Sequence, residues 1–353
     1  PYYSVIGGWV VKYLIEYIKG NGHALSSDGY FSTFISNGVS TELCFIAFSL
    51  MTLIIVYAGV KNGIERVSKI MMPILVVLSC VITVYSVTRP GAFEGVKYFL
   101  VPNFKNFSWM TVVTAMGQMF YSLSIAMGIL ITFGSYTEKE VSIESSTENV
   151  EVFDTAIAIM AGLMIIPAVF AFSGGNMENL NAGPSLMFIT IPKVFDSMGL
   201  GTLIGILFFV LVLFAALTSS IALTECAVST FQDELKWSRH KSVCILGIIM
   251  LALGSLSSLG YGPLASIQII GMQFLDFFDF LTNSVMMPIS AICICLLVSK
   301  VIGVDKIAQE VKSHNNPFKR EKIFNFMIKY VCPIFATIIL LSSVANAFGI
   351  IKM

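Results

Sequence analysis

Polar side chains interrupt an apolar part of this sequence in the stretch GQMFYSLSIAMG, from Gly117 to Gly128. Ser122 and Ser124 are two residues apart, so a regular helix of 3.6 residues per turn would point their hydroxyls about 200° away from each other. If the helix breaks here, both hydroxyls and several freed carbonyl oxygens can converge on one site. Such breaks are tolerated in membranes where they line a cavity, and they are typical of secondary transporters. The alternative is a regular helix in which each serine bonds to a carbonyl one turn earlier.

A second set of hydroxyls lies in FAALTSSIALTE, from Phe214 to Glu225. Hydroxyls beside small residues leave room for a hard cation, which takes oxygen ligands. Close packing of small residues between helices is the alternative, and the ionisable Glu225 in the same segment weakens it. The residues that fall at helical spacing on adjoining faces are Ala215, Thr218, Ser219 and Leu223.

Two further positions could contribute charge or a hydrogen bond within a membrane. Asp154 stands at the expected cytoplasmic start of an apolar span, where it is either an N-cap with Thr155 beside it or a carboxylate that supplies charge to an ion site. Tyr2 and Tyr3 lie near the start of the first span. A tyrosine there either joins the aromatic belt at the membrane interface or hydrogen-bonds a ligand carboxylate.

The composition predicts that most of this chain faces lipid instead of water. Of its 353 residues, 56% are hydrophobic and 12% are charged, and the mean hydropathy is +0.85, whereas a soluble domain has about 25% charged residues. We therefore expect a polytopic α-helical membrane protein. The formal net charge of zero argues against a nucleic-acid partner. The cysteines show no metal-ligand spacing and the histidines are far apart, so no haem or other organic cofactor is expected.

Nine apolar segments are long enough to span a bilayer, at roughly 20 residues each. Two longer loops, 89–110 and 174–199, are expected to hold extra structure. Lys and Arg concentrate in alternate short loops, which places these loops and the chain start in the cytoplasm and predicts a multi-pass protein of the inner (plasma) membrane. The loop 137–153 disagrees, because it is mainly acidic. The segments lie near 2–18, 41–59, 67–88, 111–136, 154–173, 200–224, 242–260, 280–302 and 324–350.

The sequence resembles the neurotransmitter:sodium symporter family, in its bacterial branch, over essentially the whole chain. Several motifs carry the resemblance in the family's order: PYYSVIGGW, GVKNGIERVSKIMMP, GQMFYSLSIAMGILITFGSY, DT with AGLMIIPAVFAF behind it, ALTSSIALTE and FQDELKWSR. This family is a standard example of broken-helix transporters. The resemblance therefore implies an all-α, inverted-repeat (5+5) fold with about nine transmembrane helices in this chain.

The resemblance also implies how the chain is organised. Residues 1–353 form a single transmembrane domain, in which 1–88 are the remainder of the first repeat, 111–303 are the second repeat and 324–350 are an extra C-terminal helix. The spans match the family's third to eleventh helices, and its first two are expected to be missing. Since the first helix supplies half of the substrate site and half of both sodium sites, the chain as given should not transport alone. The activity expected here is that of the intact protein.

The resemblance assigns roles to individual residues. Ser122 and Asp154 are implied as ligands of a first sodium ion. A second sodium ion would be bound by the carbonyl of Ala215 and the hydroxyls of Thr218 and Ser219. Tyr3 would meet the substrate carboxylate, and the full set of substrate positions is Tyr3, Tyr121, Ser124, Met127, Ser219 and Leu223. The implied gate residues are Gln118 and Asp279 on the extracellular side, and Tyr136 and Asp233 on the cytoplasmic side.

The expected substrate is a neutral hydrophobic or aromatic amino acid, because Tyr121, Met127 and Leu223 form an apolar floor. Chloride-dependent relatives place an anion beside the first sodium site, and many relatives have asparagine where this chain has Asp154. A fixed carboxylate could replace that anion, which predicts chloride-independent symport with sodium by alternating access.

Other functions remain possible on the sequence. A carrier of the same fold could use another coupling ion, and the chain could be a non-transporting fragment or subunit. An intramembrane enzyme is not expected, because no histidine lies in a span and Asp154 and Glu225 lack a partner motif. The expected partners are the amino acid, sodium ions and the lipid bilayer, and the oligomeric state is left open.

Overall fold

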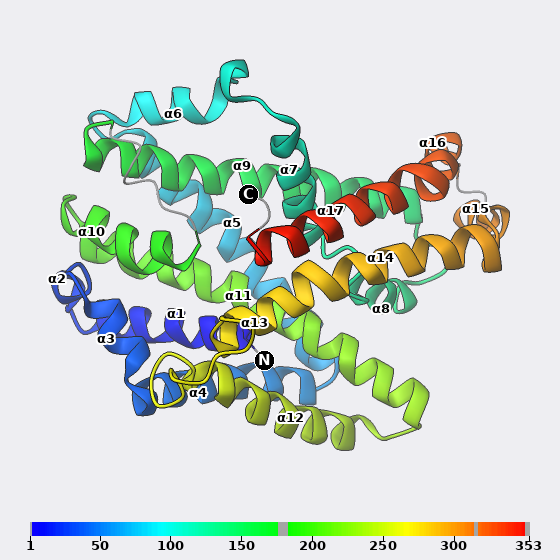
Figure 1. Ribbon diagram of the computed structural model, residues 1–353, viewed down its shortest axis with the longest axis horizontal. Coiled ribbons are helices and arrows are strands. Elements are labelled where there is room, and N and C mark those ends of the chain that lie inside the picture. The colour runs from blue at the N-terminus through cyan, green and yellow to red at the C-terminus, as the bar shows by residue number, and fades with distance from the viewer. Residues whose placement is uncertain (1, 176–182, 314–316, 350–353) are drawn as a thin grey trace. The chain divides into compact units, whose positions relative to one another are not determined.

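The computed structural model describes residues 2–175, 183–313 and 317–349, and there the chain consists of helices joined by short connections (Figure 1). The all-α prediction is confirmed. The α-helices are α1 Tyr3–Ile18, α2 Gly22–Leu25, α3 Tyr30–Ser36, α4 Gly38–Tyr57, α5 Arg66–Val87, α6 Ala92–Leu100, α7 Trp109–Ser122, α8 Ile129–Ser135, α9 Ile143–Ser173, α10 Ile191–Asp196, α11 Gly201–Leu235, α12 Arg239–Leu259, α13 Phe274–Asp279, α14 Met287–Leu296, α15 Val304–Val311, α16 Glu321–Phe326 and α17 Cys332–Ala347. Wider or tighter helical turns adjoin them at η1 Val60–Glu65, η2 Phe104–Asn106, η4 Leu186–Thr190, η5 Phe280–Met286, η6 Leu297–Ile302 and η8 Met327–Val331.

Within the described residues, seven helical stretches are long and apolar enough to cross a membrane. The two remaining expected spans take other forms. The first is α1, with 16 residues, and the span expected at 111–136 is divided between α7 and α8. The chain is therefore a multi-pass membrane protein. The seven stretches are Gly38–Tyr57, Val60–Val87, Ile143–Ser173, Gly201–Leu235, Arg239–Leu259, Phe274–Ile302 and Glu321–Ala347.

The chain divides into two compact units. The first unit contains Pro1–Pro102 and Ala156–Asp276, and the second contains Asn103–Thr155 and Phe277–Met353. These boundaries differ from the repeat boundaries expected from the resemblance, and the division into repeats stays a prediction.

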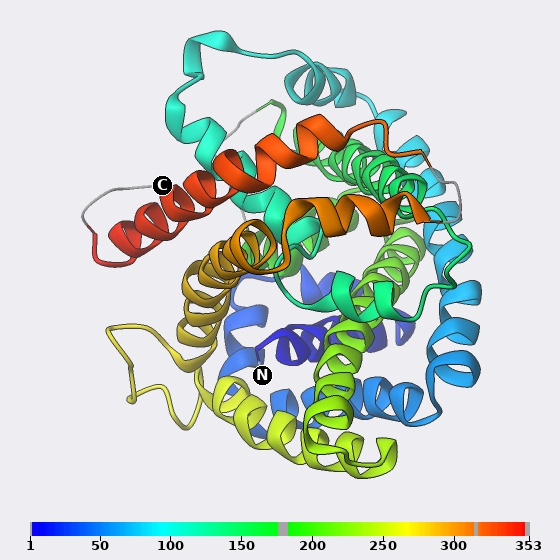
Figure 2. The same ribbon diagram turned by 90° about the vertical axis from the view of Figure 1, so that its right-hand side faces the viewer.

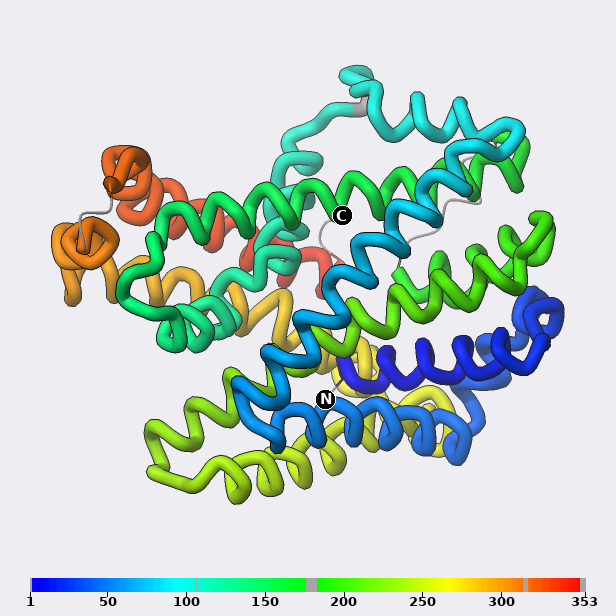
Figure 3. The backbone as a smooth tube through the Cα atoms, turned by 180° about the vertical axis from the view of Figure 1, so that it is seen from behind, coloured from blue at the N-terminus to red at the C-terminus, as the bar shows by residue number. Residues whose placement is uncertain are grey.

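The first unit is built around α1, which packs against α4 and α11, while α12 packs against α4 and α11 (Figure 3). The backbones of α1 and α4 approach closely because Gly8 has no side chain. A Cβ on Gly8 would lie 2.6 Å from the backbone nitrogen of Phe45. Further along α1, Tyr13 has no exposed surface and its hydroxyl donates to the carbonyl of Phe188 over 2.7 Å. This contact ties the turn η4 to the core of the unit.

The second unit has its own apolar core, where α14 and α17 pack together and α7 contacts α17 (Figure 2). Because lipid tails are as apolar as these side chains, van der Waals packing between the helices, and not removal from water, favours their association. The buried members of the core are Phe120, Met287, Ala291, Ala336 and Ile339.

The loops expected to hold extra structure do so in their described parts. The loop 89–110 contains α6 and η2, and α6 lies against α9. A Cβ on Gly95 would lie 2.7 Å from the Cα of Pro167, so only glycine permits this approach. The loop 174–199 contains η4 and α10, and its positions 176–182 lie outside the described residues.

Helix α9 begins at Ile143, well before the start near residue 154 that hydropathy predicts. Glutamate is a good helix former, so the polar residues before the apolar segment can extend the helix. The acidic side chains of this extension pair with one arginine. Arg320 lies 3.2 Å from carboxylate oxygens of both Glu148 and Glu151. The carboxylate of Glu144 accepts the backbone N–H of Arg320 over 2.9 Å. Three of the acidic residues that disagreed with the charge rule, Glu144, Glu148 and Glu151, therefore lie next to a cationic residue of the chain itself.

Candidate ion and substrate sites

The stretch GQMFYSLSIAMG contains the break in the helix that its serines predict. Helix α7 ends at Ser122 and α8 begins at Ile129. Between them, Ser124, Ala126 and Gly128 have φ angles of 54°, 64° and 79°, in the left-handed region. A residue with a side chain is strained there by about 1–2 kcal/mol, so the surroundings must hold this segment in place.

The hydroxyl of Ser122 donates a hydrogen bond of 2.6 Å to a carboxylate oxygen of Asp154 (Oδ1). The Ser122 hydroxyl therefore does not bond to a carbonyl one turn earlier in its own helix, which was the alternative. Asp154 lies inside α9, so its alternative role as an N-cap is wrong, because α9 starts earlier than expected. A carboxylate and a hydroxyl this close, next to a backbone that has left the helix, form a set of oxygen atoms that suits a hard cation.

The other implied substrate residues of the second unit lie directly before the break or within it. Tyr121 is the penultimate residue of α7 and is 36% exposed. Ser124 lies in the left-handed part of the break. Met127 packs against the apolar core of the second unit. The break therefore carries both polar and apolar positions within a few residues.

The first unit contains a second set of oxygen atoms on α11. The hydroxyls of Thr218 and Ser219 donate to the carbonyl of Ala215 over 3.0 and 3.1 Å. The side chain of Ser219 also hydrogen-bonds the phenol of Tyr3 on α1. Leu223, one turn further along α11, is 37% exposed. Two hydroxyls thus bond to one carbonyl of their own helix, and their role as sodium ligands stays a prediction.

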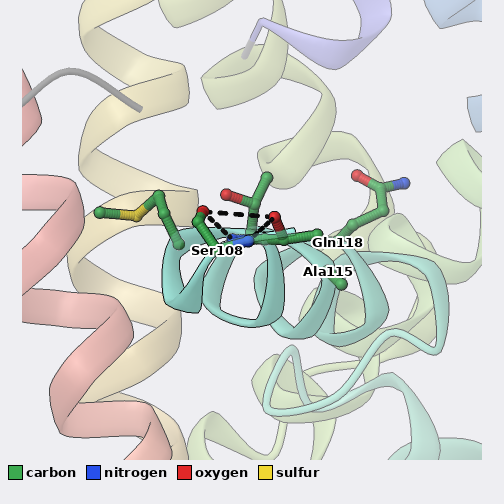
Figure 4. A pocket seen from close by; sticks show the side chains of 6 residues that line it. Ser108, Ala115 and Gln118 are labelled. Atoms are coloured by element: carbon green, nitrogen blue, oxygen red, sulfur yellow. Dashed lines mark hydrogen bonds between the residues drawn. The ribbon is translucent and has the colours of Figure 1, made fainter. Parts of the chain in front are cut away.

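The implied gate residues have different surroundings. Gln118 lines an open groove of about 500 Å³ along α7 (Figure 4). Asp279 ends α13 and accepts a bond of 2.8 Å from the side chain of Asn283. Tyr136 follows α8, and Asp233 is exposed in the last turns of α11. The other residues that line the groove are Ser108, Met110, Thr111, Thr114 and Ala115.

An ion pair inside the first unit was not predicted from the sequence. Glu225, on α11, has no exposed surface, and Arg239 at the start of α12 lies on it with contacts of 3.0 and 2.5 Å. Arg239 also donates to the backbone carbonyl of Val56 over 2.7 and 3.0 Å. Glu225 stood out in the sequence as an ionisable group in an apolar span. A buried carboxylate needs a cation, and this requirement was the one signal that pointed to such a partner.

The comparison with protein families gives one match over most of the chain. The model of the sodium:neurotransmitter symporter family matches residues 11–350. An uncharacterized sodium-dependent transporter of Bacillus subtilis (strain 168), YhdH, is 34% identical over 355 aligned residues, which cover 99% of this chain and 77% of the relative. An uncharacterized sodium-dependent transporter of Haemophilus influenzae is 31% identical over 351 residues, which cover 97% of this chain and 75% of the relative.

The fold also has a solved counterpart. The crystal structure of MhsT in complex with L-phenylalanine matches with a TM-score of 0.83 and 36% sequence identity. The match covers 97% of this chain and 77% of MhsT.

Proposed function

Since this chain belongs to the sodium:neurotransmitter symporter family and is a sodium-coupled transporter, not an enzyme, we propose that it carries a neutral amino acid with a hydrophobic or aromatic side chain. The single observation that carries this proposal is the break between α7 and α8, with Ser122 bonded to Asp154 beside it. A break in a membrane helix frees polar backbone groups, and these must be used by a ligand, an ion or water.

The chemistry of an amino acid matches the groups at these positions. Its ammonium needs acceptors, and the carbonyls freed between Ser122 and Ile129 are acceptors. Its carboxylate needs donors, and the phenol of Tyr3 is one. For the side chain, Tyr121, Met127 and Leu223 offer aromatic and apolar surface and no charge of their own. MhsT, which was solved with L-phenylalanine, supports the same substrate class.

Sodium is coupled to this substrate through two sites. The first is formed by Ser122 and Asp154, where a carboxylate supplies most of the charge that a cation needs. The second is formed by the carbonyl of Ala215 and the hydroxyls of Thr218 and Ser219. An ion that binds one conformation more tightly than another shifts the protein toward it, and substrate binding and ion binding then strengthen each other by the same factor.

Chloride is not needed in this scheme. Asp154 places a carboxyl group next to Ser122, and it takes the place that an anion would otherwise fill. The transporter works in the inner (plasma) membrane and moves its substrate by alternating access.

Uptake into proteoliposomes tests the proposal. The whole protein is reconstituted, and uptake of radiolabelled phenylalanine is measured with an inward sodium gradient, with potassium in place of sodium, and with gluconate in place of chloride. We expect uptake that requires sodium and does not require chloride. Unlabelled leucine, tyrosine and tryptophan should compete, whereas glutamate, lysine and monoamines should not.

Each arm of this experiment can overturn a different part of the proposal. Competition by glutamate, lysine or a monoamine above that by leucine would reject the substrate class. A chloride requirement would reject the role of Asp154 as a built-in anion. Uptake driven by a proton gradient without sodium would favour a carrier of the same fold with other ion coupling.

A further inference from the structure

A buried pair of hydroxyls joins α4 to α11 in the first unit. Thr52 on α4 has no exposed surface, and Ser220 on α11 is 3% exposed. The hydroxyl of Thr52 donates to that of Ser220 over 3.0 Å, and the carbonyl of Phe48 lies 3.3 Å away as a second acceptor. Neither residue drew attention in the sequence, because isolated hydroxyls are common in membrane helices.

Packing alone does not require these hydroxyls. Valine has nearly the same shape as threonine and would fill the space at position 52 without a polar atom. A buried hydroxyl is unfavourable unless it is hydrogen-bonded. The bond between Thr52 and Ser220 also fixes geometry, because a one-residue shift turns α11 by 100° and moves it by 1.5 Å. A contact of 3.0 Å does not survive such a shift.

Ser220 lies on the turn of α11 that carries the oxygen atoms described above. It follows Thr218 and Ser219 directly, and at 100° per residue its side chain points about 100° away from that of Ser219 and about 160° away from that of Thr218. Ser219 is exposed, whereas Ser220 is buried against α4. Helix α4 therefore contacts this turn of α11 on a different side from the one that exposes Ser219.

A second polar tie between the same two helices lies about one turn away. Val56 follows Thr52 by one turn of α4, and its carbonyl accepts two bonds from Arg239. Arg239 in turn holds Glu225 of α11, which lies a little over one turn beyond Ser220. Because polar contacts join α4 and α11 at two positions along their length, α11 can neither slide along α4 nor rotate against it without breaking one of these contacts.

We propose that Thr52 is a positioning residue for sodium: through Ser220 it fixes the rotation of α11 that presents the hydroxyls of Thr218 and Ser219 to the ion. This inference rests on the proposed second sodium site and adds to it a residue that touches neither ion nor substrate. Loss of the Thr52 hydroxyl removes none of the proposed ligands, but it lets the turn of α11 that carries Thr218 and Ser219 rotate. Sodium then binds a set of oxygen atoms that is no longer held at the right spacing.

The test is a sodium titration of substrate binding to the purified whole protein, with radiolabelled phenylalanine as the probe. Thr52→Val should raise the sodium concentration for half-maximal binding by about three- to tenfold, as expected for one lost hydrogen bond. Thr52→Ser keeps the hydroxyl and should restore the wild-type value. At saturating sodium the affinity of Thr52→Val for phenylalanine should match that of the wild type, because a bound ion holds the turn, with Ser219 and Leu223 on it, in the same position in both proteins.

Thr41→Val is the matched control. Thr41 is also a threonine on α4, is 1% exposed, and reaches another helix at the carbonyl of Ser258, 3.4 Å away. It lies three turns from Thr52, and its loss should leave the sodium titration unchanged. If Thr52→Val fails to fold, Ser220→Ala removes the same bond from the other side and should give the same shift.

The outcomes separate the two proposals. If wild-type binding does not depend on sodium, the proposed function fails before Thr52 is considered. If the wild type titrates with sodium but Thr52→Val and Ser220→Ala behave like Thr41→Val, the inference about Thr52 is rejected. A loss of phenylalanine affinity that persists at saturating sodium also rejects it, since it would reveal a general structural defect.

Discussion

Arg239 forms a bidentate ion pair with Glu225, in which Nη1 and Nη2 each donate to one carboxylate oxygen, and Glu225 has no exposed surface. The same guanidinium donates twice to the carbonyl of Val56. One side chain at the first position of α12 thus joins three helices of the first unit: α4, α11 and α12. An exposed ion pair contributes little to stability, but a buried carboxylate depends on its partner.

Removal of this arginine should strongly destabilise the protein. Arg239→Met leaves the Glu225 carboxylate buried without its cation, which costs about 3–5 kcal/mol. The double variant Glu225→Gln, Arg239→Met removes both charges and should be more stable than Arg239→Met alone. Thermal unfolding followed by gel filtration measures both. A single variant as stable as the wild type would show that the pair contributes nothing.

The break between α7 and α8 predicts an unusual response to glycine. Ala126 has a φ of 64°, where a side chain is strained and glycine is not. Ala126→Gly should therefore leave stability unchanged or raise it by up to about 1 kcal/mol, whereas Ala126→Val should lower it. The control is Ala158→Gly in the middle of α9, which should destabilise by about 1 kcal/mol. Equal losses for both glycine variants would contradict the left-handed conformation at Ala126.

The charge of Asp154 can be removed while its shape is kept. Asp154→Asn should weaken sodium binding on the order of tenfold, because a hydrogen-bonded charge contributes about 1.5–3 kcal/mol. If the carboxylate acts as a built-in anion, chloride should partly restore transport by this variant. Sodium titrations with chloride or gluconate check both effects. Asp305→Asn, an exposed carboxylate on α15, serves as control and should change neither.

The segment that contains η4 and α10 should loosen in acid. Lys193 on α10 lies 2.5 Å from Asp28 and holds the pKa of that carboxyl below its usual range. A depressed folded-state pKa stabilises the contact above the ordinary aspartate pKa of about 4. That stabilisation is lost as the pH falls through the lower, folded-state pKa. The neighbouring pair of His23 and Asp196, 2.8 Å apart, faces the same loop.

Hydrogen exchange across residues 186–196 measures this loosening. Exchange should rise as the pH falls below about 4, after correction for the intrinsic pH dependence of exchange. In Asp28→Asn the rise should be absent and exchange should already be faster at neutral pH. A rise of the same size in Asp28→Asn would show that the contact between Lys193 and Asp28 is not its cause.

Much of the architecture could be predicted because its causes are local in the sequence. Spanning length and apolar composition located the membrane helices, since a bilayer demands about 20 apolar residues from each. The two serines in GQMFYSLSIAMG predicted a break, because a regular helix cannot direct both to one side. The spacing of Thr218 and Ser219 likewise placed them on adjoining faces of one helix, whereas their role as sodium ligands stays a prediction.

Other features depend on contacts between residues that are distant in the chain, and only the tertiary structure decided them. Hydropathy placed the start of α9 near Asp154 and so allowed an N-cap there, but the helix extends to Ile143, where pairing with Arg320 supports it. The bond between Thr52 and Ser220 joins residues 168 positions apart. Periodicity states which face of a helix a residue lies on. It does not state which helix packs against that face, and this choice determines whether a buried hydroxyl or carboxylate finds its partner.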